Sequence, residues 1–357
     1  MKLRELHDEV ERSASVEDPK LTMDGLLDRY LEAKSISKQP TTIAWYRRHF
    51  KQHVRPVIGT RRLRDLRSAD IQLLLANARN TSRTKRKGEP LSPTSLRNLL
   101  VGIRAALAWA VRQNLVLTNV ADKVEAPLLE NREPVNIKPA DVHAILSAVK
   151  GTELEAIVAF SAWTGLRRSE SCALRWGDID LEKRTICVQR AAVNLGSKVI
   201  VKSPKTKKSK RTDFLAPSVV KLLRDHRADQ ARRHDALGTF RLDDRAKRYV
   251  FDRQATGEPW NPNELSRLFS RMVRKKENKD KFPALRFHDL RHAYASMLFD
   301  AKVPLKVISE SLGHSAIGVT SSIYVHLTSE AMLDKADALE AHLGPTVQPL
   351  PDASSDR

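Results

Sequence analysis

Two histidines, an arginine and a tyrosine that could act on a phosphate lie within about forty residues of one another, towards the C-terminal end of the chain. Residues 287–292 read Phe-His-Asp-Leu-Arg-His, and they are followed by Leu-Gly-His at 312–314 and by Tyr324. His288 and Arg291 are three residues apart, so a helix would place both side chains on one face. Arginine and histidine can hold a phosphate group through charge and hydrogen bonds, and a tyrosine hydroxyl can attack one. This spacing predicts phosphoryl-transfer chemistry.

The same stretch has two other interpretations when its residues are taken alone. His288 and His292 have the spacing of a metalloprotease zinc helix. Asp289 stands, however, where that motif needs a glutamate as base, and Arg291 would bring a positive charge towards the metal. The other interpretation is structural, with the histidine pair capping a core helix. Of the three, zinc hydrolysis is the least favoured.

Two upstream segments supply further positive charge. Residues 164–170 read Thr-Gly-Leu-Arg-Arg-Ser-Glu, in which Gly165 permits a tight turn that presents Arg167 beside the next helix. Glu170 is expected to orient Arg167 rather than to do chemistry, because a carboxylate would repel a phosphate. Residues 202–211 contain six basic residues and no acidic one. Their turn is either a solvated hairpin or a contact to phosphates.

The charge of the whole chain favours a polyanionic partner. Its 357 residues carry a formal net charge of +20, which creates a field that attracts nucleic acid. Cys172 and Cys187 lack a metal-like spacing and are too few for a disulfide scaffold, which fits a reducing cytosol. The sequence has no apolar signal core and no uncharged apolar run of membrane-spanning length. We therefore expect a cytoplasmic, nucleoid-associated protein without a membrane partner.

Apolar residues recur at helical spacing through the N-terminal part of the chain. They predict four main helices, at about 22–31, 41–50, 63–75 and 93–111. Residues 56–59 read Pro-Val-Ile-Gly, which predicts that the second helix breaks there. Residues 21–126 are thus expected to form a compact helical bundle, preceded by a short charged helix or extension at 1–20.

The remainder of the chain is expected to hold a second, mixed domain. Residues 127–139 include three prolines and little periodicity, which is typical of an interdomain linker. The second domain, at 140–328, is mostly helical, with strand-like segments at 185–188, 198–201 and 212–215. Residues 329–344 carry an apolar helical stripe, and the polar residues 345–357 predict a disordered tail. The predicted fold class is mainly α with a small antiparallel β-sheet (α+β).

The order of these motifs resembles that of the tyrosine recombinase (phage integrase) family. After residues 164–170 come Pro-Lys-Thr at 204–206, His-Asp-Leu-Arg-His at 288–292 and Leu-Gly-His-Ser at 312–315, and Tyr324 follows His314 by ten residues. The resemblance covers nearly the whole chain. It implies that the helical bundle is a core-binding domain for DNA, that the second domain is catalytic, and that the apolar helix at 329–344 docks on a neighbouring protomer.

The resemblance also implies a role for six residues, which are Arg167, Lys205, His288, Arg291, His314 and Tyr324. The tyrosine aligns with the nucleophile that attacks the scissile phosphodiester and forms a 3′-phosphotyrosyl link. The two arginines align with the pair that clamps the non-bridging oxygens, and the lysine with the hairpin residue that protonates the leaving 5′ oxygen. The two histidines align with those that assist proton transfer. No cofactor or metal ion is implied.

The implied activity is that of a site-specific DNA recombinase, the integrase of a phage or integrative element, with strand transfer like that of type IB topoisomerases. The implied partners are double-stranded DNA with attachment-type sites, further copies of the chain in a tetramer on DNA, and host or element-encoded DNA-bending accessory factors. Two alternatives are a resident chromosome-resolving or inversion recombinase and a non-catalytic DNA-binding regulator of the same fold. A regulator would have no use for Tyr324.

Other basic side chains are expected to contact the DNA backbone, because neutralising phosphates supplies much of the affinity for DNA. They lie in a loop of the first domain and in the hairpin of the second, and are Arg83, Lys85, Arg86, Lys87, Lys207, Lys208, Lys210 and Arg211.

Overall fold

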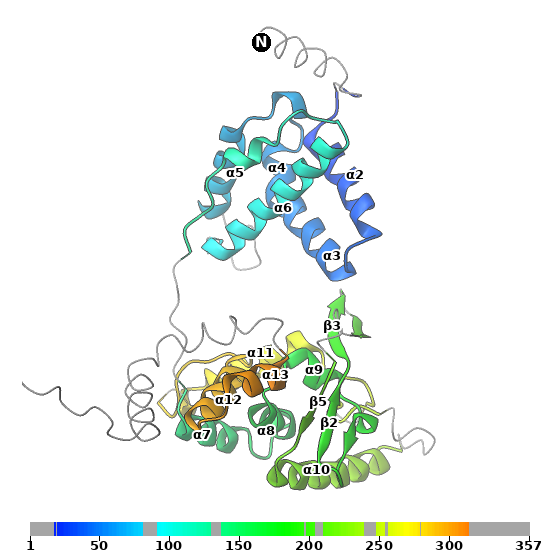
Figure 1. Cartoon of the computed structure of the whole chain (residues 1–357), viewed down its shortest axis with the longest axis vertical. Helices are drawn as coiled ribbons and strands as arrows, with labels where there is room; N and C mark the ends of the chain where they lie inside the picture. Colours follow the sequence, from blue (N-terminus) through cyan, green and yellow to red (C-terminus); the bar gives the residue numbers. More distant parts are fainter. Residues whose placement is uncertain are drawn as a thin grey trace, which may run out of the picture. The chain divides into compact units, whose positions relative to one another are not determined.

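A computed structural model describes most of the chain: residues 18, 20–80, 91–129, 137–195, 198–203, 210–238, 248–253, 256–278 and 280–313. The chain divides into two compact units, residues 1–133 and 134–357 (Figure 1), and each unit has its own apolar core. Several predicted features lie outside the described residues. They are most of the helix or extension at 1–20, the basic loop with Arg83, Lys85, Arg86 and Lys87, the residues Lys205, Lys207 and Lys208, and all residues from His314 onwards, which include Tyr324, the helix at 329–344 and the tail at 345–357.

The N-terminal unit is a bundle of helices. Its α-helices are α2 (Met23–Ser35), α3 (Pro40–His49), α4 (Arg55–Ile58), α5 (Ser68–Asn80) and α6 (Pro93–Arg112), with shorter turns η1 (Phe50–Val54), η2 (Leu63–Asp65) and η3 (Val120–Lys123). The side chain of Thr22 accepts a hydrogen bond from the backbone of Gly25, and that of Ser92 accepts one from Ser95. These caps fix where α2 and α6 begin, because they satisfy backbone donors that the first helical turn leaves free.

The helical run that was predicted to break at residues 56–59 does end within them, because α4 stops at Ile58 and Gly59 is its C-cap, but Pro56 itself does not end it. α3 passes through η1, which is a π-helical turn, directly into α4. Pro56 lies in the first turn of α4, directly after the π-helical turn, and a proline is tolerated in the first turn of a helix. Phe50 and Val54 are fully buried and Ile58 nearly so. Their four-residue spacing keeps one apolar face in the core, which favours continuing the helix.

The second unit is mixed, as predicted. Its helices are α7 (Pro139–Val149), α8 (Glu155–Thr164), α9 (Arg168–Ala173), α10 (Pro217–Ala236), α11 (Pro262–Val273), α12 (Asp289–Asp300) and α13 (Leu305–Leu312), with shorter turns η4 (Trp176–Asp178) and η7 (Lys276–Asn278). Its strands are β1 (Ile179–Asp180), β2 (Thr185–Val188), β3 (Ala191–Leu195), β4 (Lys198–Lys202) and β5 (Arg211–Phe214). The predicted class, mainly α with little antiparallel β-structure, is confirmed.

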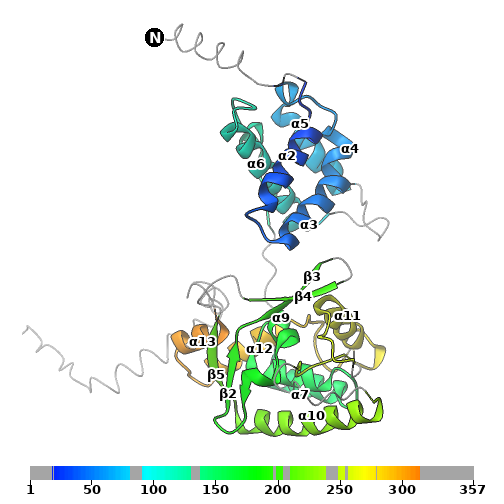
Figure 2. The same ribbon diagram turned by 90° about the vertical axis from the view of Figure 1, so that its right-hand side faces the viewer.

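The strands form two small sheets rather than one (Figure 2). In the first, β2 lies between β1 and β5, and Val188 is opposite Arg211. In the second, β3 and β4 form a separate hairpin. Of the three strand segments predicted from the sequence, β2 and β5 therefore share a sheet and β4 does not. The pairing matters for the site, because it fixes the strand that begins at Arg211.

Three packing contacts bring distant segments of the second unit together. α12 packs against both α8 and α13, and α13 also packs against β5. β5 and α13 can be followed side by side in Figure 2. The turn after α8, the start of α12, the end of α13 and the start of β5 therefore surround one place. Within the described ranges, no helix has both the length and the apolar character needed to cross a membrane.

Candidate active site

The turn between α8 and α9 orients the first arginine of the predicted site. α8 ends at Gly165, which has a left-handed backbone with φ +60°. Arg167 then precedes α9, and its backbone N–H donates to Oε2 of Glu170 at 2.9 Å. Its guanidinium Nη1 also donates to Oε1 of the same carboxylate, at 2.9 Å. The expected contact between Glu170 and Arg167 is thus present, and it restrains both the backbone and the side chain of Arg167.

Gly165 is required at this turn for two reasons, and Gly165→Ala should destabilise the protein. The left-handed backbone alone costs an alanine about 1–2 kcal/mol. An added Cβ would also lie 2.2 Å from Cδ1 of Tyr294, so this ring would have to move. Gly151→Ala is a matched control, since Gly151 also has positive φ but no atom within 4 Å of an added Cβ. Urea unfolding should show the larger loss for Gly165→Ala; equal losses would contradict the predicted clash.

Arg291 joins the turn after α8 to the end of α13. Its side chain is buried, and Nη1 donates to the carbonyl oxygen of Gly165 at 2.8 Å while Nη2 donates to the carbonyl oxygen of Leu312. Burial, followed by the charge of Arg167, lowers the pKa of Arg291 to about 9. The guanidinium is still protonated at neutral pH, so it brings a positive charge into a poorly solvated place.

Three arginines converge on the end of α13. Arg211 Nε donates to the carbonyl oxygen of Ser311 at 2.6 Å, and Arg167 Nη2 donates to that of Gly313 at 2.9 Å. With Arg291 on Leu312, three successive carbonyls each receive a guanidinium N–H. Carbonyls at a helix C-terminus lack intrahelical partners and carry partial negative charge, so they attract such donors. The structure therefore brings Arg167 and Arg291 together immediately before the position of His314 in the chain.

His288 lies at the start of α12, one turn from Arg291. Burial, followed by the charges of His292 and Arg291, lowers its pKa to about 4. At neutral pH it is therefore an uncharged imidazole that can accept or donate a proton. The ring of His292 lies edge-on to that of His288, with centroids 5.2 Å apart. The carboxylate of Asp289, the residue after His288 in the sequence, accepts hydrogen bonds from the backbone N–H and the guanidinium of Arg286.

Arg211 differs from its predicted place on the DNA-contacting surface. Its side chain is only 8% exposed and forms an ion pair with Glu170 at 3.0 Å. This corrects the expectation that Arg211 contacts the DNA backbone from the protein surface. Its neighbour Lys210, also predicted to contact DNA, is exposed. The basic run at 202–211 concealed this role, because residue type does not distinguish an interior arginine from its exposed neighbours.

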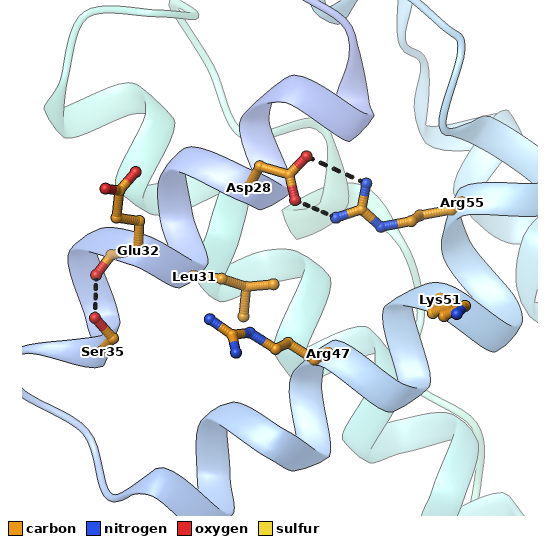
Figure 3. Close-up of a pocket in the computed structure, with 7 residues that line it drawn as sticks. All are labelled: Asp28, Leu31, Glu32, Ser35, Arg47, Lys51 and Arg55. Atoms are coloured by element: carbon orange, nitrogen blue, oxygen red, sulfur yellow. Dashed lines mark hydrogen bonds and ion pairs between the residues drawn. The ribbon is translucent and has the colours of Figure 1, made fainter.

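The N-terminal unit contains a hollow of about 680 Å³ between α2 and the α3–α4 helical run (Figure 3). Figure 3 shows Asp28 facing Arg55, and both carboxylate oxygens of Asp28 accept hydrogen bonds from that guanidinium. Arg47 and Lys51 line the opposite side from Glu32. Acidic and basic groups compensate one another here, and the hollow holds none of the six predicted catalytic residues. We assign it no part in phosphoryl transfer.

Two family models match the chain. The phage integrase family matches residues 136–331, which is more than half of the chain. The N-terminal SAM-like domain of phage integrases matches residues 22–76. The first match contains the turn with Arg167, the segment with His288 and Arg291, and Tyr324.

Curated proteins resemble the chain over most of its length. A tyrosine recombinase XerC-like protein of Caldanaerobacter subterraneus subsp. tengcongensis is 28% identical over 347 residues, or 92% of this chain and 85% of that protein. An integrase of Streptomyces ambofaciens is 29% identical over 286 residues, which are 77% of this chain and 68% of that protein. The ICEBs1 integrase of Bacillus subtilis is 26% identical over 252 residues, which are 70% of this chain and 66% of that protein.

Solved structures share the fold. The Tn1549 transposon integrase, in complex with transposon right end DNA, has a TM-score of 0.71 and 24% identity, covering 90% of this chain and 99% of that one. The lambda integrase, as a tetramer bound to a Holliday junction, has a TM-score of 0.62 and 18% identity, covering 86% and 78%.

Proposed function

Since the chain belongs to the phage integrase family of tyrosine recombinases, we propose that it is the integrase of a phage or integrative element and recombines DNA through a 3′-phosphotyrosyl intermediate. The observation that carries the chemical part is the convergence of Arg167 and Arg291 on the backbone that leads to His314. Two guanidinium groups from distant segments are held there against mutual repulsion. A phosphodiester is the ligand that such a pair suits, because both its charge and its geometry match.

In the proposed reaction the hydroxyl of Tyr324 gives its proton to one of the two histidines, His288 or His314, and attacks the scissile phosphorus, and the bond from phosphorus to the 5′ oxygen breaks. Lys205 gives that oxygen its proton, so the products are a 3′-phosphotyrosyl link and a free 5′-hydroxyl. Attack by the 5′-hydroxyl of another strand then reseals the DNA and regenerates Tyr324. The phosphotyrosyl bond preserves the energy of the phosphodiester, so this strand transfer, like that of type IB topoisomerases, needs no ATP.

Arg167 and Arg291 stabilise the negative charge of the transition state in this scheme. A guanidinium has five N–H donors, and each of these two arginines uses only part of its set on the protein. In the proposal, the remaining donors bind the non-bridging oxygens. His288, neutral near pH 7, and His314 assist proton transfer. Because side chains supply the positive charge, the proposal includes no metal ion or other cofactor.

The proposed domain layout follows the same family pattern. Residues 21–126 form the core-binding domain, 127–139 the linker and 140–328 the catalytic domain, and together the two domains clamp double-stranded DNA at attachment-type sites. Residues 329–344 dock on a neighbouring copy within a tetramer. The extension at 1–20 and the tail at 345–357 have no direct role in the proposal. The structures of relatives bound to DNA, one of them a tetramer on a Holliday junction, support this assembly. DNA-bending accessory factors and a cytoplasmic, nucleoid-associated location complete the proposal.

The test is covalent trapping on a nicked DNA duplex. The duplex carries a repeated core sequence found in the DNA that flanks the gene, and the nick lets the short 5′-hydroxyl fragment escape so that resealing fails. We expect an adduct that survives denaturing detergent and forms equally with and without EDTA. If no flanking repeat gives an adduct, the integrase proposal is wrong. Activity lost in EDTA and restored by zinc would instead support the metal interpretation.

The XerC-like relative favours one second candidate, a resident recombinase that resolves or inverts chromosomal DNA. The same trapping assay separates the two functions when duplexes from chromosomal dimer-resolution regions are included. Adducts on these duplexes alone would favour the resident recombinase. An adduct on either DNA excludes a non-catalytic regulator.

A further inference from the structure

Arg211 is the third arginine at the end of α13, and the proposed reaction gives it no role. It begins β5, and its side chain is 8% exposed. It makes hydrogen bonds in two directions: Nη1 and Nη2 donate to the two oxygens of Glu170 at 3.3 and 3.0 Å, and Nε donates to the carbonyl oxygen of Ser311 at 2.6 Å. One side chain therefore bridges α9 and the end of α13.

Glu170 is shared between Arg211 and Arg167. Its side chain is 7% exposed, and each of its oxygens accepts a hydrogen bond from both residues. Burial by itself would raise the pKa of this carboxyl, but the hydrogen bond and charge of Arg211, with the charge of Arg167, lower it below its usual value. The carboxylate is thus ionised and surrounded by donors. Because Arg211 also binds this carboxylate, the guanidinium of Arg167 donates to Glu170 only through Nη1, and its Nη2 donates to the carbonyl oxygen of Gly313.

β5 also holds the end of α13 through a second residue. Ser311 Oγ donates to the carboxylate of Asp213, which lies two residues after Arg211 and hence on the same face of the strand. The guanidinium of Arg211 lies against Gly313: a Cβ added to that glycine would be 2.9 Å from Nη1. Gly313 has φ +64°, so this close approach coincides with a backbone turn that favours glycine. In the sequence, Lys205 precedes Arg211 by six residues and His314 directly follows Gly313.

We propose that Arg211 is a positioning residue for DNA strand cleavage. By holding Glu170 and the Ser311 backbone at once, it keeps the guanidinium of Arg167 directed at the phosphate and fixes the backbone that leads to His314. The inference rests on the proposed recombinase function. It adds a residue that does not touch the DNA to the six that do the chemistry.

The consequence of removing Arg211 follows from the geometry. A carboxylate and an arginine form their strongest pair when two parallel N–H groups meet two oxygens. Without Arg211, Glu170 has only Arg167 to neutralise it, so Nη2 of Arg167 is drawn from Gly313 to the vacated oxygen. Arg167 then turns away from the phosphate. A lysine at position 211 cannot replace the bridge, because a single ammonium does not match the spread of donors that reaches both Glu170 and Ser311.

The experiment compares Arg211→Met and Arg211→Lys with the wild type in single-turnover adduct formation on the nicked duplex. The affinity for intact duplex and the melting temperature are measured in parallel. We expect Arg211→Met to slow adduct formation about 100-fold, as for a displacement of about 1 Å in a catalytic group, with DNA affinity changed less than about threefold. Arg224→Met is the matched control. It removes an exposed arginine that pairs with Glu182, and it should cleave at the wild-type rate.

A double variant separates positioning from simple structural support. In Arg211→Met with Glu170→Gln, the charge that captures Arg167 is gone, so adduct formation should recover about 10-fold relative to Arg211→Met. If the single and double variants are equally slow, or if Arg211→Met cleaves at the wild-type rate, the inference is overturned. Should Arg211→Met fail to fold, Arg211→Lys decides, since a wild-type rate there also overturns it. Absence of any adduct from the wild type would instead refute the recombinase proposal.

Discussion

Replacing Tyr324 with phenylalanine is expected to abolish the covalent protein–DNA adduct and to leave the affinity for duplex DNA unchanged. Phenylalanine preserves the ring but removes the oxygen that would form the phosphotyrosyl bond. Loss of a covalent nucleophile lowers turnover by on the order of 10⁴-fold or more, so adduct formation should fall below detection. The measurement is trapping on the nicked duplex, with binding followed separately by a gel-shift or fluorescence titration.

Two other tyrosines make this test specific. Tyr249→Phe is a control in the same unit, and it should form adducts at the wild-type rate. Tyr294 lies close to the proposed site, with its hydroxyl 3.3 Å from Ser311 Oγ, and it would be the next candidate if Tyr324→Phe still formed adducts. Burial raises the pKa of Tyr294, which makes its phenolate harder to form. Persistent adducts in Tyr324→Phe would show that the nucleophile had been misassigned.

The proposed arginine pair could be recognised from the sequence, but the atoms that hold it could not. Arg167 and Arg291 were identified because each lies in a motif with a defined spacing. Their partners include the carbonyl oxygens of Gly165, Leu312 and Gly313. Every residue has a carbonyl, so only the packing of α12 against α8 and α13 determines which of them a guanidinium can reach.

Arg211 illustrates the same limit in a side chain. Arg211 lies in the basic run at 202–211, where its residue type predicts the same surface position as for its basic neighbours. What distinguishes it is the pairing of β5 with β2 and the packing of α13 against β5. The hydrogen bond from Arg211 to Ser311 joins residues 100 apart in the sequence, and the pairing with β2 also joins separate segments, so no local pattern predicts these contacts.

Local rules placed the end of one helix only approximately. The Pro-Val-Ile-Gly segment predicts a break at residues 56–59, and the helical run from α3 passes Pro56 and ends at Ile58, before Gly59. Inside a helix a proline removes one hydrogen bond and its ring clashes with the preceding turn, but here the preceding turn is π-helical rather than α-helical. Fold class, by contrast, followed from periodicity, because long amphipathic segments such as α6 leave little ambiguity.

Arg291→Lys is expected to lower the rate of adduct formation by about 10²- to 10³-fold, the usual effect of losing one donor to a developing charge. A lysine ammonium cannot reach both Gly165 and Leu312 and still face the phosphate, because its donors spread from a single nitrogen. The variant should also lose about 1–3 kcal/mol of stability, since one buried carbonyl is left without its donor. Single-turnover trapping and urea unfolding measure the two effects. Arg224→Lys, at an exposed position, is the control and should change neither.

The defect in Arg291→Lys should depend on pH in a defined direction. Burial and the charge of Arg167 lower the pKa of Arg291 to about 9, although arginine is the strongest base among the side chains. A lysine starts from a lower pKa, so the same surroundings favour its neutral form, which holds no phosphate. The ratio of variant to wild-type cleavage rate should therefore fall as pH rises and the ammonium loses its proton. A ratio that is constant with pH would mean that lost geometry, rather than lost charge, explains the whole defect.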